Sequence, residues 1–136
     1  MLLMGESING TRKQVAEAIQ ARDAEFIKTL AQDQIDAGAG LLDVNGGVAG
    51  GNEVEDLLWL IDIVMGVTDM QLMVDSASPK ALDAGVQAII DRGGKVPFIN
   101  SISGEQPRID AVMPLVEKHK CPVVGLCLSD EGIPPT

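Results

Sequence analysis

Short apolar runs alternate with longer segments of helical periodicity along the chain. The runs predict five β-strands, at residues 2–4, 40–45, 71–75, 96–100 and 122–126. Between them, apolar residues recur every three or four positions, which predicts amphipathic helices. These helices are expected at 11–21, at 23–37, from Asn52 to Met65, from Ser78 to Gly93, and from Pro107 onward. Strands that alternate with helices are typical of a parallel sheet covered by helices.

Local signals mark where several of these helices begin. Asn52, with Glu55 three residues later, has the spacing of a capping box. Ser78 followed by Pro79 is a capping residue with a proline in the first turn. Pro114 lies inside the last helical pattern, and we expect it to break or kink that helix because proline lacks the backbone N–H.

Polar side chains gather where the predicted strands end. They are Glu6 and Asn9 after the first strand, Asp43 and Asn45 in the second, Asp75 and Ser76 after the third, and Asn100 and Ser101 after the fourth. In a parallel barrel these strand ends converge on one mouth, where active sites are built. Four successive strands that deliver an acid or an amide to one face therefore predict a binding or catalytic site.

Each of these residues also has a structural interpretation, because Asp and Asn are common turn formers. Asp43 can be a turn residue, although it interrupts an apolar strand, which favours a functional role. Asp75 could cap the following helix, a role that Ser78 fills better. Asn100 could be a buried amide with satisfied hydrogen bonds, and Glu6 could be a hydrogen-bond partner for neighbouring loops.

The candidate mouth carries carboxylates and amides but no His, Cys or Lys, so covalent catalysis by an activated nucleophile is not supported. Such a set suits a flat heterocycle rich in N–H donors. A carboxylate can accept two such hydrogen bonds at once, and an amide can both donate and accept. A second possibility is a hard cation held by Glu6, Asp43 and Asp75.

Other polar features carry weaker signals. The glycine-rich segment 46–51 lacks the spacing of a phosphate-binding loop, which favours a flexible turn. Arg12 and Lys13 could meet an anionic group at the mouth or belong to the solvated surface. His119 lies between two lysines at a helix end, and we expect it on the surface, where it complements the helix dipole.

Composition excludes several classes of function. The chain has 136 residues with 20 acidic and 10 basic side chains, and a net charge of −10 argues against nucleic-acid binding. Aromatic residues make up only 2%, which argues against base stacking. The chain lacks an apolar run of the roughly 18 residues that span a membrane and a signal-peptide pattern, so we expect a cytoplasmic protein with no membrane partner. Cys121 and Cys127 imply no disulfide framework, and with the single histidine they do not form a zinc site.

Five segments of the sequence resemble those of pterin-binding methyltransferases. They read L-L-M-G-E-S-I-N-G-T-R, L-L-D-V-N-G-G, L-M-V-D-S-A, F-I-N-S-I-S and G-L-C-L-S-D-E-G-I-P, in the family's order and across the whole chain. The nearest resemblance is to the methyltetrahydrofolate:corrinoid methyltransferases. That family shares its fold with the folate module of cobalamin-dependent methionine synthase and with dihydropteroate synthase.

The resemblance implies a TIM barrel that binds a pterin in its mouth. Asp75 would accept hydrogen bonds from the amino and ring N–H groups, Asn100 would bind the pterin in the same network, and Asp43 and Asn45 would line the floor. Asp75 and Asn100 are thus the expected catalytic residues, with Glu6, Asn9, Ser76 and Ser101 completing the binding site.

In such a family a methyl group moves between N5 of tetrahydrofolate and the cobalt of a corrinoid. Amide hydrogen bonds that strengthen in the transition state would assist this step without a strong general acid. The chain has no D-x-H-x-x-G corrinoid-binding motif, so the corrinoid (cobalamin) would arrive on a partner protein.

The family's second pterin carboxylate and the asparagine that approaches N5 belong to later strands. We therefore expect residues 1–136 to be the N-terminal portion of a single pterin-binding (β/α)8 barrel, an α/β fold that typically needs about 250 residues. This portion alone should be inactive, and a homodimer is expected.

Two alternatives stay open from the sequence. One is a dihydropteroate synthase-like enzyme, although the first strand and the loop after the second strand do not resemble that family. The other is a non-enzymatic five-stranded receiver or flavodoxin-like domain, for which this length is natural. Strand order separates them, because a barrel has the order 1-2-3-4-5 and the doubly wound domain 2-1-3-4-5.

Overall fold

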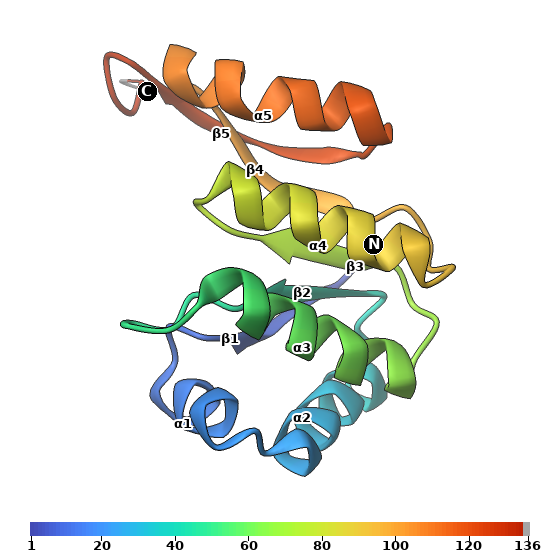
Figure 1. The fold of residues 1–136 in the computed structure, drawn as a ribbon. Helices are drawn as coiled ribbons and strands as arrows, with labels where there is room; N and C mark the ends of the chain where they lie inside the picture. Colours follow the sequence, from blue (N-terminus) through green and yellow to red (C-terminus); the bar gives the residue numbers. More distant parts are fainter. Residues whose placement is uncertain (135–136) are drawn as a thin grey trace.

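The fold is a five-stranded parallel sheet with helices on one face, in a computed structural model that describes residues 1–134 (Figure 1). The strands are β1 Met4–Asn9, β2 Leu41–Asn45, β3 Leu72–Asp75, β4 Phe98–Gly104 and β5 Val123–Ser129. The helices are α1 Lys13–Ala21, α2 Ala24–Asp36, α3 Glu53–Val67, α4 Pro79–Asp91 and α5 Gln106–His119.

Neighbouring strands in the sheet are also neighbours in the sequence. The order is β1-β2-β3-β4-β5, and every pairing is parallel. This is the order of a barrel wall, so the prediction of a barrel-type sheet is confirmed and the receiver or flavodoxin-like alternative is wrong.

The hydrophobic core lies between the sheet and the helices. Leu42 and Val44 of β2 and Val74 of β3 pack there with Leu57 and Ile61 of α3, all fully buried. Because side chains alternate between the two faces of a strand, Leu41, Asp43 and Asn45 face the opposite side of the sheet. That opposite side becomes the interior of a barrel, so the polar ends of β2, β3 and β4 face inward.

Three strands extend beyond their predicted ends. The first was expected at residues 2–4 but runs from Met4 to Asn9, so Glu6 lies inside the strand and Asn9 is its last residue. β4 runs on to Gly104 and β5 to Ser129. The added residues include serines and a glutamate, which apolar patterning does not mark as strand. Strands β1 and β4 continue to pair with their neighbours past register shifts, one of which contains Glu6.

Helix boundaries follow the local signals, with one exception. The side chain of Asn52 accepts a hydrogen bond from the Glu55 N–H, and Ser78 accepts one from the Ala81 N–H, so both predicted caps are confirmed. Helix α5, however, is not broken at Pro114. Pro114 and Asp110, the residue whose carbonyl loses its donor, are both exposed, so water can replace the missing hydrogen bond.

His119 is buried, which corrects the expectation of a surface position. Its side chain is 4% exposed, and its Nε2 atom lies 2.7 Å from Oδ1 of Asp83 in α4. Lys118 donates to the same oxygen at 2.9 Å. The pKa of Asp83 is lowered because its carboxylate accepts hydrogen bonds from His119, which has the larger effect, and from Lys118. Packing of α5 against α4 encloses the ring, and sequence periodicity does not report that contact.

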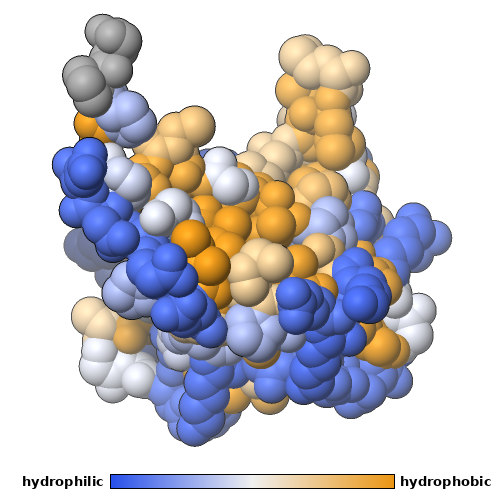
Figure 2. Space-filling model, turned by 90° about the horizontal axis from the view of Figure 1, so that it is seen from above, coloured by the Kyte–Doolittle hydropathy of each residue, from blue (hydrophilic) through white to orange (hydrophobic). Residues whose placement is uncertain are grey.

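The two edges of the sheet are open within residues 1–134, since β1 and β5 each have a single neighbouring strand. Figure 2 shows hydrophobic surface between two projecting segments, seen from the α5 and β5 end. Leu126 of β5 is 49% exposed, and the apolar residues Leu2 and Leu3 before β1 are also exposed. Among the described residues, no helix is long and apolar enough to cross a membrane.

Candidate active site

The ends of β2, β3 and β4 bring four predicted site residues together on the inner side of the sheet. Asp75 and Asn100 are direct neighbours in the β3–β4 ladder. Asp43 lies beside Met73 in the β2–β3 ladder, and Asn45 is two residues further along β2, on the same face. The parallel register therefore places two carboxylates and two amides side by side at the carboxyl ends of the strands.

Two amide–carboxylate pairs connect these residues across the sheet. Asn100 Nδ2 donates to Asp43 Oδ2 at 3.1 Å, and Asn45 Nδ2 donates to Asp75 Oδ2 at 3.1 Å. Asn45 Oδ1 in turn accepts from the Gly47 N–H at 2.8 Å. These contacts fix the orientation of both amides. The Oδ1 atom of Asp75 has no N–H donor among residues 1–134.

Asp43 is the most deeply buried acid of the group, with 1% of its surface exposed. Its pKa is raised from 3.8 to about 7, chiefly because burial disfavours the charged form. The hydrogen bond from Asn100 lowers the pKa, and the charges of Asp75 and Glu6 raise it. Glu6 of β1 is exposed and acts on Asp43 through its charge. Near neutral pH Asp43 therefore exchanges a proton, and in its protonated form it can donate to Asp75.

This shift predicts how stability depends on pH. Because Asp43 binds its proton more tightly in the folded state, its contribution to stability is full below pH 3.8 and is lost as the pH rises through about 7. Asn at this position mimics the protonated acid and still accepts from Asn100. From pH 5 to pH 8 the unfolding free energy of the wild type should fall as Asp43 loses its proton. In Asp43→Asn, we expect this fall, measured by urea titration, to be smaller by about 2 kcal/mol.

The exposed Asp69, which precedes β3 at the opposite end of the sheet, supplies the control. Asp69→Asn should follow the wild-type pH profile. A parallel profile for Asp43→Asn would show that Asp43 keeps an ordinary affinity for protons.

Asn9 and Ser76 are committed to local structure. Asn9 Oδ1 accepts from the Thr11 N–H at 2.9 Å and from the Thr11 hydroxyl at 2.6 Å, which closes the turn after β1. The Ser76 hydroxyl donates to Glu53 and accepts from the Ser78 N–H at 2.9 Å. The structure therefore does not join their side chains to the paired acids and amides, although both residues lie beside the group.

A cavity of about 370 Å³ opens beside Asp75 and Asn100. Ser76 and Ser101 also line it, together with Arg108 of α5 and Leu126 of β5. The peptide bond between Asn100 and Ser101 is cis. Arg108 and Leu126 were not among the predicted site residues. The sequence did contain a signal for Arg108. A cation in the first turn of a helix interacts unfavourably with the helix dipole, which indicates that the residue is kept there for another contact.

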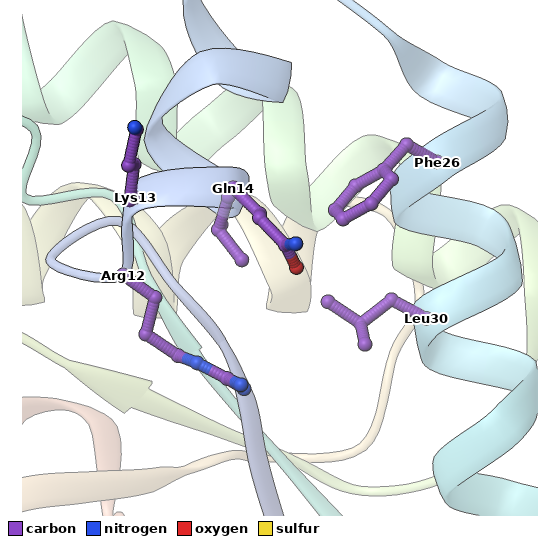
Figure 3. A pocket seen from close by; sticks show the side chains of 6 residues that line it. Arg12, Lys13, Gln14, Phe26 and Leu30 are labelled. Carbon is purple, nitrogen blue, oxygen red and sulfur yellow. The ribbon is translucent and has the colours of Figure 1, made fainter.

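Arg12 and Lys13 lie at a different pocket. With Gln14, Phe26 and Leu30 they line a pocket of about 250 Å³ between α1 and α2 (Figure 3). Both cations are exposed; Arg12 donates to the Ser7 carbonyl at 3.3 Å, and Lys13 lies 3.9 Å from Glu17. This pocket shares no lining residue with the cavity beside Asp75.

The hypothesis of a hard cation held by Glu6, Asp43 and Asp75 finds no support in the geometry. Within residues 1–134, no three His, Cys, Asp or Glu side chains converge as a metal site requires. The paired acids and amides instead present hydrogen-bonding atoms to one side of the cavity.

Comparison with known proteins decides the family. The family model described as "Pterin binding enzyme" matches residues 5–131. The chain belongs to the pterin-binding enzyme family. Methylcorrinoid:tetrahydrofolate methyltransferase of Eubacterium limosum is 34% identical over the whole chain, which covers 49% of that protein. Methionine synthase of Mycobacterium leprae (strain TN) is 32% identical over 97% of the chain, which covers 11% of that protein.

This member of the pterin-binding family shares the fold of a solved relative. Dihydropteroate synthase from Xanthomonas albilineans, in complex with 7,8-dihydropteroate, superposes with a TM-score of 0.55 at 22% identity. The match covers 90% of this chain and 44% of that protein. The five strands therefore form part of a TIM barrel, and the chain spans about half the length of the Eubacterium relative. Both predictions, of the family and of the fold, are confirmed.

Proposed function

We propose that this chain binds the pterin ring of a tetrahydrofolate at the inner ends of β2, β3 and β4. The reaction moves a methyl group between N5 of that folate and the cobalt of a corrinoid on a separate protein. Membership of the pterin-binding family supports the first part. The 34% identity to a methylcorrinoid:tetrahydrofolate methyltransferase supports methyl transfer.

The observation that carries the proposal is the position of Asp75. Its Oδ2 atom accepts from the Asn45 amide, its Oδ1 atom has no N–H donor among residues 1–134, and the residue lines the cavity. A pterin presents an amino group and ring N–H groups along one edge. A fixed carboxylate matches such an edge because it can accept two parallel hydrogen bonds.

Asn100 lies beside Asp75 and supplies the second recognition element. One N–H of its amide is used by Asp43, which leaves the other N–H and Oδ1 for the ring. In methyl transfer to the corrinoid, the bond from the methyl carbon to N5 breaks and N5 keeps the electron pair and gains a proton. The cobalt supplies the electron pair of the new carbon–cobalt bond. Hydrogen bonds that strengthen as charge builds on the ring lower the barrier to this step.

The test uses the protein that carries this chain, with methyltetrahydrofolate and free reduced cobalamin as substrates. We expect the absorbance of methylcobalamin to appear, and the reverse reaction from methylcobalamin and tetrahydrofolate to run as well. Asn100→Ala should lower kcat/KM by about 100-fold, since an interaction made with the reacting ring is lost. Dihydropteroate made from a dihydropterin pyrophosphate and p-aminobenzoate, without methyl transfer, would favour the dihydropteroate synthase alternative instead.

Two further expectations from the sequence, a homodimer and a cytoplasmic location, stay predictions. The open edges of the sheet are compatible with a second copy. Light scattering of the purified protein measures its mass and tests the homodimer directly.

A further inference from the structure

Arg108 makes four hydrogen bonds to backbone carbonyls next to the candidate site. Its Nε and Nη2 atoms donate to the Ser101 carbonyl at 3.0 and 2.8 Å. Nη2 also donates to the Ser76 carbonyl at 3.0 Å, and Nη1 donates to the Ala77 carbonyl at 2.8 Å. One guanidinium thus joins the chain that follows β3 to the chain inside β4.

Two of these three carbonyls belong to the residues that directly follow the two expected catalytic residues. Ser76 follows Asp75, and Ser101 follows Asn100. The backbone also joins the same two chain segments at this point, where the Ser76 N–H donates to the Asn100 carbonyl at 3.2 Å. The planar fork of arginine is suited to hold several oxygens in a fixed arrangement.

The guanidinium of Arg108 contacts these carbonyls rather than a carboxylate of the described part of the chain. Among residues 1–134 its guanidinium has no carboxylate within 4.0 Å, whereas Arg22 and Arg92 both form ion pairs. It lies in the first turn of α5, where the helix dipole disfavours a cation. Hydrogen bonds from a charged donor are about twice as strong as neutral ones, so the four contacts offset that cost.

We propose that Arg108 is a positioning residue that holds Asp75 and Asn100 side by side for pterin binding. The inference rests on the proposed function for its ligand, and on the four carbonyl contacts for its geometry. Loss of the guanidinium frees the segments after β3 and within β4 to separate, and the two recognition groups lose their common alignment. Preorganisation of this kind strengthens binding because the ligand no longer has to order the site.

Two measurements on the protein that carries this chain test the proposal. In Arg108→Ala we expect the dissociation constant for methyltetrahydrofolate, measured by calorimetry, to rise at least tenfold. In the same variant without ligand, we expect the Ser76 amide to exchange hydrogen at least tenfold faster, while the amide of Val74, inside the paired part of β3, is unchanged. Arg108→Lys should recover part of both effects, because an ammonium can reach some of the carbonyls.

Arg92→Ala is the matched control. Arg92 pairs with Asp62 and donates to the Ala88 carbonyl at 3.1 Å, at the end of α4 away from the site. It should leave both the affinity and the Ser76 exchange rate at wild-type values. Equal weakening of binding by Arg92→Ala and Arg108→Ala would overturn the proposal, as would wild-type affinity in Arg108→Ala.

The exchange measurement separates this inference from the proposed function. If the wild-type protein fails to bind methyltetrahydrofolate, the proposed function is wrong, and the Ser76 exchange rate still decides the role of Arg108. If Arg108→Ala does not fold, Arg108→Lys takes its place, with an intermediate exchange rate as the expected result. Uniformly faster exchange at Ser76 and Val74 would show a general stabilising role and overturn the proposal.

Discussion

Replacement of Asp75 by Ala is expected to abolish methyltetrahydrofolate binding in the protein that carries this chain. The Asp75 carboxylate lines the cavity, and its Oδ1 atom has no N–H donor among residues 1–134, so its loss would leave the ring N–H groups without this acceptor. Losing hydrogen bonds to a charged acceptor in a desolvated site costs about 3 kcal/mol or more, which corresponds to at least 100-fold in affinity. Calorimetric titration measures the loss.

The control separates recognition from folding. Asp69→Ala removes a carboxylate from the segment before β3, at the other end of the same strand, where the side chain is exposed. It should bind as the wild type does. Asp75→Asn keeps the shape but replaces one oxygen by a donor, so it should also bind weakly. Unchanged affinity of Asp75→Ala would contradict the assignment of Asp75 to pterin recognition.

Replacement of Gly46 by Ala is expected to cause the largest loss of stability. A Cβ atom at Gly46 would lie 2.6 Å from the Leu57 nitrogen and 2.8 Å from the Leu57 Cα, both in the backbone of α3. A helix backbone cannot yield as a flexible side chain can, so α3 must shift away from the end of β2. We expect the free energy of unfolding in urea to fall by about 3 kcal/mol.

Gly66→Ala is the matched control for that change. Gly66 lies in the same helix and is exposed, and a Cβ atom at this position would meet no other segment within 4 Å. Alanine favours the helix over glycine, so this variant should gain up to about 1 kcal/mol. A Gly46→Ala protein as stable as the wild type would mean that the loop after β2 can move without cost.

Local patterns were enough to predict most of the elements and the central site residues. Asp75 and Asn100 interrupt or follow apolar strand runs, and the caps at Asn52 and Ser78 depend on residues three positions apart. Such signals involve only neighbours in the chain. The alternation of strands and helices likewise predicted a parallel sheet, and the structure confirms it.

Contacts between distant segments were not predictable from those patterns. Glu6 lies within β1 because the strand pairs with β2 on both sides of it, and β4 extends to Gly104 because it pairs with β5. His119 is buried where α5 packs against α4, and it contacts Asp83, 36 residues away in the sequence. Arg108 reaches carbonyls up to 32 positions away. Apolar periodicity describes one helix or strand at a time. It does not indicate which polar groups of other elements will contact that helix or strand.

The sequence by itself determined the fold class, the resemblance to pterin-binding enzymes, and the set of acids and amides at the strand ends. Side-chain period and residue type are local properties, and both can be read along the chain. Only the tertiary structure decided how these groups pair, with Asn100 on Asp43 and Asn45 on Asp75. The raised pKa of Asp43 follows from that arrangement, because burial and neighbouring charges exist only once the strands lie side by side.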